Sequence, residues 1–296
     1  MAERLALAIP YYSGRAYLAE ALASVRAQAD PDWSLVVVDD SPAKEEARAL
    51  VEQLGDARVR YVANAGTLGM VAAWNRCLEE AQGELVTLLH ADDRLLPGYV
   101  GAMKALAAAH PRAVACFCPA RTIDAAGRRR FSLQDDVKRL LVPRGGREVL
   151  LAGEPGLRAL MRGDFIVCPS LCWRRAVLGA RRFEPRWRQV QDLELLTRLL
   201  LEDETLVGTR TAHYAYRRHA ANATAQQTES LLRFEEEYAI FDAIAARARA
   251  RGWARAARTA ESKLVLRLHL GWRVLCDLLR LRPRLAARTL RFLVSR

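Results

Sequence analysis

The first 118 residues alternate between short apolar runs and longer stretches of helical composition. The apolar runs lie at residues 5–9, 35–38, 59–63, 85–89 and 114–117. Short runs of this kind are typical of strands in a parallel sheet that is buried on both faces. Helical stretches separate the runs at residues 15–28, 43–54 and 69–80. The pattern therefore predicts an α/β fold with a doubly wound, mostly parallel sheet flanked by helices.

The pattern changes in the second half of the chain. Loops rich in Arg and Gly lie near residues 128–130 and 143–146, and a short helical stretch follows at 155–161. A longer amphipathic helix is predicted over residues 191–201. Residues 229–296 are helical in composition almost throughout. We therefore expect a C-terminal helical extension beyond the sheet.

Polar clusters follow four of the predicted strands. They lie at residues 10–13, 39–41, 64–66 and 90–93. In an open α/β sheet the loops after the strands gather at one edge, and a nucleotide is the natural ligand there. None of the clusters contains a G-x-G-x-x-G motif or a Walker A lysine loop, so the phosphate cradles of dinucleotide-binding and P-loop proteins are excluded.

Asp92 and Asp93 stand side by side at the end of the fourth predicted strand. Adjacent carboxylates repel each other, and a hard divalent cation such as Mg²⁺ or Mn²⁺ relieves that repulsion while it bridges substrate phosphates. The alternative interpretation is a polar turn that leads into the helix after Pro97. The other polar clusters favour the metal.

In order and spacing, these motifs resemble the family 2 glycosyltransferases of the GT-A fold. The motifs are Pro10-Tyr11-Tyr12, Asp39-Asp40-Ser41, Asn64-x-Gly66, Trp74-Asn75, His90-Ala91-Asp92-Asp93, Gln191-Asp192 and Tyr216-Arg217-Arg218-His219. The resemblance covers residues 4–225. Three positions depart from the family pattern: His90 stands where the family's Asp-x-Asp motif begins, Gln191 replaces a Glu, and Tyr11 stands where a small Thr is often found.

The resemblance implies a nucleotide-diphosphate sugar as the donor. The residues implied to contact that donor are Pro10, Tyr11, Asp39, Asp40, Asn64, Gly66, Gly69, Asp93, Arg217 and His219. Asp92, together with His219, is implied to hold a divalent metal cofactor, Mn²⁺ or Mg²⁺, on the diphosphate. Asp192 is implied to be the catalytic base that deprotonates the acceptor hydroxyl.

Some of these residues also have purely structural explanations. Asp192 stands where a helix begins, and Asp is a preferred N-cap, although a capping residue can also serve as a base. Ser41 and Pro42 are suited to the N-cap and N1 positions of the next helix, which leaves the two preceding acids unexplained. The pair Arg217 and Arg218 is either surface charge or a grip on the diphosphate.

The chain carries a net charge of +12, and its C-terminal part contributes much of this charge. Residues 263–296 contain nine Lys or Arg and a single acid, Asp277. The leucines that share one face of the predicted helix are Leu264, Leu268, Leu275 and Leu279. The helix either docks on the catalytic domain with a solvated basic side or binds an anionic membrane surface. No nucleic acid is expected, because leucines rather than stackable aromatics interleave the basic residues.

Composition indicates the cellular setting. The sequence shows no signal peptide and no apolar run of transmembrane length, and its six Cys lack the spacing of a zinc site. Reduced thiols are the simpler account. We therefore expect a cytoplasmic protein, with a possible peripheral position on the inner face of the cell membrane.

The resemblance and the motifs together predict an inverting glycosyltransferase with a glycan or lipid-linked acceptor, as in polysaccharide biosynthesis. Residues 1–118 are expected to bind the nucleotide sugar and 119–228 to bind the acceptor and carry catalysis, with 229–296 as a basic helical extension. One alternative is a nucleotidyltransferase, although the loop after the first strand lacks the usual Gly-rich basic character. The other is a non-enzymatic basic protein that binds membrane or nucleic acid.

Overall fold

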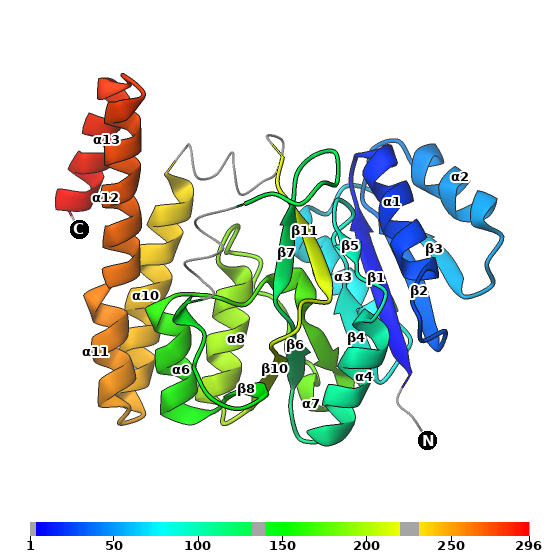
Figure 1. Ribbon diagram of the computed structural model, residues 1–296, viewed down its shortest axis with the longest axis horizontal. Coiled ribbons are helices and arrows are strands. Elements are labelled where there is room, and N and C mark those ends of the chain that lie inside the picture. The colour runs from blue at the N-terminus through cyan, green and yellow to red at the C-terminus, as the bar shows by residue number, and fades with distance from the viewer. Residues whose placement is uncertain (1–3, 132–139, 220–230, 296) are drawn as a thin grey trace.

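The computed structural model describes residues 4–131, 140–219 and 231–295. Its central sheet has eight strands in the order β3-β2-β1-β4-β9-β6-β10-β8 (Figure 1). Four parallel strands form the N-terminal half: β1 (Leu5–Tyr11), β2 (Trp33–Asp39), β3 (Val59–Ala63) and β4 (Leu85–Leu88). The helices between them are α1 (Arg15–Arg26), α2 (Glu45–Leu54) and α3 (Met70–Glu80). The predicted alternation of strands and helices is confirmed.

The second half of the sheet is mixed. Its strands are β6 (Ala115–Phe117), β8 (Glu148–Leu151), β9 (Cys172–Arg174) and β10 (Leu206–Thr209). Strand β9 is antiparallel to both of its neighbours, β4 and β6, whereas β10 is parallel to β6 and antiparallel to β8. The helical elements here are α4 (Tyr99–Ala109), α6 (Gly153–Arg162), η1 (Cys168–Ser170), α7 (Arg175–Leu178) and α8 (Gln191–Leu201). Parallel pairs still outnumber antiparallel ones, as predicted.

A small second sheet lies beyond the end of β4. It consists of β5 (Arg94–Leu95), β11 (Tyr214–Arg217) and β7 (Ala120–Ile123), with β11 in the middle. Strand β11 is parallel to β7 and antiparallel to β5. Because β5 follows directly after Asp93, this sheet brings a segment from late in the chain against the acidic turn.

Alternate residues of β1 face two separate clusters of buried apolar side chains. Leu5, Leu7 and Ile9 belong to one cluster, which also includes residues of α1 and α4. Ala6 and Ala8 belong to the other, which includes residues of α3 and α8. The sheet is thus covered on both faces, which is why its strands are almost continuously apolar.

The C-terminal helices stack beyond the sheet, on the side away from β3 (Figure 1). They are α10 (Leu232–Ala250), α11 (Ala254–Ser262), α12 (Leu264–Leu279) and α13 (Pro283–Val294). Helix α12 buries Leu266 and Leu270 against its neighbours. The four leucines predicted to share a face are instead 46% to 73% exposed. Within the described ranges, no helix combines the length and apolarity needed to cross a membrane.

The start of α2 differs from the prediction. The helix begins at Glu45, with Lys44 as its N-cap, so Ser41 and Pro42 do not begin it. The hydroxyl of Ser41 instead donates to Asp39 Oδ1 at 2.6 Å. The Ser41 side chain therefore bonds to the nearby end of β2 and does not cap α2 as expected.

Candidate active site

A cavity of about 2290 Å³ opens along the end of the sheet. Its walls come from the ends of β1 and β4, the N-terminus of α8, and faces of α10, α11 and α12. The predicted site residues that line it are Pro10, Tyr11, Asp40, Gly69, Asp92, Asp192 and His219. The predicted residues that lie outside its wall are Asp39, Asn64, Gly66, Asp93 and Arg217. One cavity therefore brings together the predicted metal pair and the predicted base.

Asp92 and His219 face each other although they lie far apart in sequence. His219 Nε2 lies 3.1 Å from Asp92 Oδ2, and the two side chains are 16% and 30% exposed. Two ligand atoms that share one octahedral divalent ion are about 3 Å apart, so this pair fits such an ion. The His219 ring also packs against Tyr17, with ring centroids 5.1 Å apart. An imidazole nitrogen and a carboxylate oxygen suit Mn²⁺ well.

Asp93 has a different environment from Asp92. It is fully buried, and its carboxylate accepts the hydroxyl of Tyr214 at 2.9 Å and the backbone N–H of Arg217 at 2.7 Å. Burial, and then the charge of Asp92, hold the pKa of Asp93 well above its ordinary value. Asp93 thus fastens β11 to the end of β4 and presents no oxygen to the cavity.

Arg217 is also fully buried. Its Nε donates to the backbone oxygen of Asp92 at 2.6 Å, its Nη1 donates to that of Ala125 at 2.9 Å, and its Nη2 pairs with Glu20. The guanidinium also stacks over the ring of Tyr17 at 4.5 Å. The expectation of a donor contact is therefore not matched by its position. The guanidinium bonds to protein groups, among them the backbone oxygen of Asp92, and in this way it helps to position Asp92.

His90 lies beside the same turn. Its ring packs against Trp74 at 4.9 Å, and ligand atoms of His90, Asp92 and Asp93 lie within 4.8 Å of one another. Burial lowers the pKa of His90 despite the nearby charge of Asp92. Its Nε2 is buried and has no hydrogen-bond partner in the described part of the chain. A neutral imidazole with such a nitrogen is a further candidate metal ligand, one that the sequence analysis did not assign.

The two acids at the end of β2 are both buried, and only Asp40 lines the cavity. Asp39 accepts hydrogen bonds from the backbone of Ser41 at 2.8 Å and from the hydroxyl of Tyr61 at 2.8 Å. Asp40 lines the cavity and accepts the backbone N–H groups of residues 68 and 69 at 2.7 and 2.9 Å, as well as Asn64 Nδ2 at 2.9 Å. Asp40 therefore holds the loop over residues 64–69 against the cavity.

Tyr11 lies at the end of β1. It is 1% exposed, and its hydroxyl donates to Glu46 Oε2 at 3.0 Å. Burial, followed by this hydrogen bond, raises the pKa of the phenol. The neighbouring Tyr12 is 57% exposed and also lines the cavity. Tyr12 therefore presents more ring surface to a ligand than Tyr11 does.

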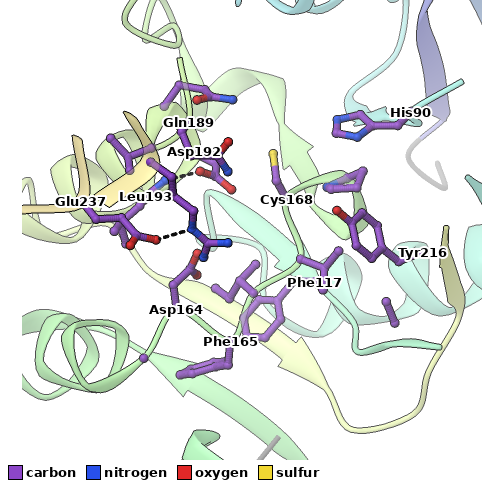
Figure 2. Close-up of a pocket in the computed structure, with 18 of the residues that line it drawn as sticks. His90, Phe117, Asp164, Phe165, Cys168, Gln189, Asp192, Leu193, Tyr216 and Glu237 are labelled. Carbon is purple, nitrogen blue, oxygen red and sulfur yellow. Dashed lines mark hydrogen bonds and ion pairs between the residues drawn. The ribbon is translucent and has the colours of Figure 1, made fainter. Parts of the chain in front are cut away.

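Asp192 is the second residue of α8, whose N-cap is Val190. Its Oδ1 accepts the N–H of Leu193 at 2.9 Å, so the N-cap interpretation is wrong by position. Asp192, Asp164 and Glu237 lie on one side of the cavity, opposite His90 and Tyr216 (Figure 2). Burial, and then the charge of Asp192, raise the pKa of the neighbouring Cys168 thiol well above its ordinary value. The Cys168 thiol beside Asp192 therefore stays protonated.

Sequence reasoning missed a large part of the cavity wall. The missed charged residues include Arg158 and Arg162 on α6, Asp164, Arg233 and Glu237 on α10, and Arg255 and Arg258 on α11. Arg233 Nε donates to Glu237 Oε1 at 2.8 Å (Figure 2). These residues belong to no motif. The only signals were the short helical stretch predicted at 155–161, for the arginines of α6, and the helical composition after residue 229, for the residues of α10 and α11.

Sequence comparison connects the chain to known proteins. It matches the family described as Glycosyl transferase family 2 over residues 6–179. A Campylobacter jejuni protein, GalNAc(5)-diNAcBac-PP-undecaprenol beta-1,3-glucosyltransferase, is 31% identical over 98 residues, or 32% of this chain and 31% of that protein. The chain spans about a third of the length of the curated relatives that it matches.

Solved structures show the same fold. TarS 1-349 of S. aureus in complex with UDP-GlcNAc superposes with a TM-score of 0.62 at 16% identity, covering 82% of this chain and 66% of that chain. The mannosyltransferase PcManGT from Pyrobaculum calidifontis, in complex with GDP-Man and Mn²⁺, gives 0.60 at 16% identity and covers 98% and 86%. These similarities establish the GT-A fold and confirm the predicted fold class.

Proposed function

Because the chain belongs to glycosyl transferase family 2, we propose that it is an inverting glycosyltransferase that moves a sugar from a nucleotide-diphosphate donor to an acceptor hydroxyl. The observation that carries the proposal is a single cavity lined by both the Asp92–His219 pair and the Asp192 carboxylate. A donor diphosphate at the first and an acceptor hydroxyl at the second place the two reactants in one enclosed space.

The reaction is a single displacement. Asp192 accepts the proton of the acceptor hydroxyl, whose oxygen bonds to the anomeric carbon of the sugar. The bond from that carbon to the donor's diphosphate breaks at the same time, and the nucleoside diphosphate leaves with the electron pair. Attack opposite the leaving group inverts the anomeric configuration, and no covalent enzyme intermediate forms.

The donor side divides into residues that contact the ligand and residues that position them. We assign contact to the lining residues Pro10, Tyr11, Asp40, Gly69 and His219. The remaining predicted residues act from behind the wall: Asp39, Asn64, Gly66, Asp93 and Arg217. Asp92 and His219 would hold a divalent cation, Mn²⁺ or Mg²⁺, which would supply positive charge to the diphosphate.

The acceptor side lies toward the C-terminal helices. We assign donor binding to residues 1–118, acceptor binding and catalysis to 119–228, and acceptor or membrane contact to 229–296. The acceptor is a glycan or a lipid-linked glycan, and the name of the Campylobacter jejuni relative specifies a lipid-linked acceptor of that kind. The exposed leucines and the arginines of α12 and α13 suit an anionic membrane surface, which supports a peripheral position on the inner face of the cell membrane.

Replacement of the base tests the mechanism. We expect Asp192→Asn to keep nucleotide binding and to lower the transfer rate at least a hundredfold, because an amide cannot take the hydroxyl proton. The measurement is nucleoside diphosphate release with and without acceptor. Glu52→Gln, on the exposed face of α2, is the matched control and should retain full activity. Full activity of Asp192→Asn would remove that residue from the mechanism, and release of pyrophosphate would indicate a nucleotidyltransferase.

Thermal stability against a panel of nucleoside diphosphates tests the metal pair. A ligand that binds the native state raises the Tm, so one nucleotide should raise it only when Mn²⁺ or Mg²⁺ is present. We expect Asp92→Ala to abolish this metal-dependent increase while the Tm without ligand changes little, because Asp92 is 30% exposed. An undiminished increase in Asp92→Ala would refute the assigned ligand.

A further inference from the structure

Two helices contribute four arginines to the wall of the cavity. Arg158 and Arg162 lie one turn apart on α6, and Arg255 and Arg258 lie one turn apart on α11. None of the four guanidinium groups pairs with a carboxylate in residues 4–131, 140–219 or 231–295. In the same ranges, the Nε of Arg158 is buried without a hydrogen-bond partner. The cavity therefore contains a group of uncompensated donors outside the donor site described above.

The two helices are fixed against each other. Glu154, in the first turn of α6, accepts the backbone N–H groups of Arg255 and Ala256 at 2.6 and 3.0 Å. Helix α11 also buries Ala256, Ala257 and Ala260, whereas the opposite face, with Arg255 and Arg258, lines the cavity. Four positive charges held together in this way repel one another, and an anionic ligand relieves that repulsion.

An apolar wall adjoins this group. Leu264, Leu268 and Trp272 recur at i, i+4 and i+8 on α12 and line the same cavity. They are 61%, 65% and 48% exposed, which is unusual for large apolar side chains in a cleft. Lys263 alone separates α12 from α11, so the apolar wall continues directly from the basic one. Apolar ligand surface that covers these side chains is stabilised by its removal from water.

We propose that the basic group and the apolar wall form a binding site for the lipid diphosphate of the acceptor. The proposal rests on the proposed glycosyl transfer and names its acceptor class: a sugar joined through a diphosphate to a lipid chain. The planar guanidinium fork matches phosphate oxygens two at a time, so four arginines suit two phosphates rather than one. The lipid then lies along α12, and the sugar hydroxyl extends toward Asp192.

Binding of farnesyl diphosphate and of inorganic pyrophosphate tests the site. Calorimetric titration in EDTA at about 150 mM salt keeps the metal-dependent donor site silent and screens weak surface attraction. Farnesyl diphosphate should bind at least tenfold more tightly than pyrophosphate, because its chain covers the apolar wall. Arg255→Gln with Arg258→Gln should weaken both ligands about tenfold or more. Trp272→Ala should weaken farnesyl diphosphate alone.

Matched controls separate the site from general surface charge. Arg267→Gln and Arg280→Gln remove exposed arginines of the same region that lie outside the cavity wall, and Leu279→Ala removes a leucine that is 73% exposed. These variants should bind both ligands like the parent. Equal losses in the controls would overturn the site. If binding depends on the arginines but farnesyl diphosphate binds no more tightly than pyrophosphate, the lipid part of the proposal is refuted. The acceptor would then be a soluble phosphorylated molecule.

Nucleotide binding distinguishes this proposal from the proposed function. The arginine variants should keep the metal-dependent rise in Tm with nucleoside diphosphate, since their side chains lie on other elements than Asp92 and His219. Nucleotide binding and transfer without arginine-dependent farnesyl diphosphate binding would refute the acceptor site alone. Arginine-dependent lipid diphosphate binding with no nucleotide binding would instead refute the glycosyltransferase.

Discussion

Arg217 and Arg218 are neighbours in sequence with opposite environments. Arg217 is fully buried and donates to the backbone oxygens of Asp92 and Ala125, whereas Arg218 lines the cavity and lies over the ring of Tyr216. Successive residues of extended backbone point to opposite faces, and Arg218 directly follows the last residue of β11, so only one of the pair points into the cavity. Arg217 therefore positions Asp92, whereas Arg218 lies on the side of the proposed donor site.

This difference predicts two separate phenotypes. Arg217→Ala should lower the free energy of unfolding by about 3 kcal/mol or more, because it leaves buried carbonyl oxygens without donors and disconnects β11 from the turn. Arg217→Lys should recover only part of this stability, since a single ammonium group cannot make all the hydrogen bonds of the branched guanidinium. Arg218→Ala should keep the unfolding midpoint in urea within the error of the parent and weaken nucleotide binding. The same loss of stability in both variants would contradict the division.

The motifs located the site residues but not their orientation. Asp39 and Asp40 were both predicted to contact the donor. The carboxylate of Asp39 instead accepts hydrogen bonds from the hydroxyls of Ser41 and of Tyr61 on β3. That outcome depends on the pairing of β2 with β3, which no local motif encodes. Asn75, from the Trp74-Asn75 motif, bonds to both backbone groups of Phe183, 108 residues away. The chemical type of each predicted site residue could be read from the sequence, whereas the direction in which its side chain points depends on tertiary contacts.

At the scale of elements, Gly83 sets how closely β4 can approach the start of β1. A Cβ added there would lie 2.8 Å from the backbone oxygen of Arg4 and 2.9 Å from the Cβ of Ala6. Backbone and β-carbon atoms cannot swing away, so a side chain forces the strand entry to shift. Because β4 leads into Asp92, this packing also determines where the acidic turn lies.

We expect Gly83→Ala to lower the free energy of unfolding by about 1–3 kcal/mol through this overpacking. Gly66→Ala is the matched control, because nothing lies within 4 Å of a Cβ at that position and its φ is not in the left-handed region. Chemical unfolding of both variants gives the comparison. Equal stability of the two would show that the start of β1 yields, and would remove Gly83 as a constraint on β4.

The alternation of strands and helices was readable because β1, β2 and β4 are buried on both faces and therefore almost continuously apolar. The small sheet could not be predicted from the sequence, because its strands have only two to four residues and give no periodic signal. Strand β9, three residues long, was missed for the same reason, although it lies between β4 and β6. Short strands of this kind are specified by their partners rather than by their own sequence.

For the whole molecule, α12 connects the cavity to the outer surface. Leu264, Leu268 and Trp272 line the cavity, and Leu275 and Leu279 continue the same helical face beyond it at i+11 and i+15 from Leu264. The opposite face buries Leu266 and Leu270. One side of this helix is therefore docked on the protein, and membrane binding through its exposed side stays a prediction.

This arrangement predicts binding to anionic vesicles that depends on a particular stripe. The purified protein should sediment with vesicles that contain anionic lipid and not with neutral ones, and high salt should weaken the binding because the arginines contribute by charge. Leu275→Asp with Leu279→Asp should lower vesicle binding about tenfold or more, since two apolar contacts are lost and two negative charges face the surface.

A charge change elsewhere provides the decisive comparison. Leu150→Asp on β8 introduces the same residue at a position that is 62% exposed and lies outside the tail. If it reduces vesicle binding as much as the α12 variants do, net charge alone governs the attraction and the stripe has no role. If only the α12 variants detach, the helix that lines the acceptor side of the cavity is also the one that contacts the membrane. A lipid-linked acceptor could then reach Asp192 without leaving the bilayer, and the rate with such an acceptor should fall together with vesicle binding.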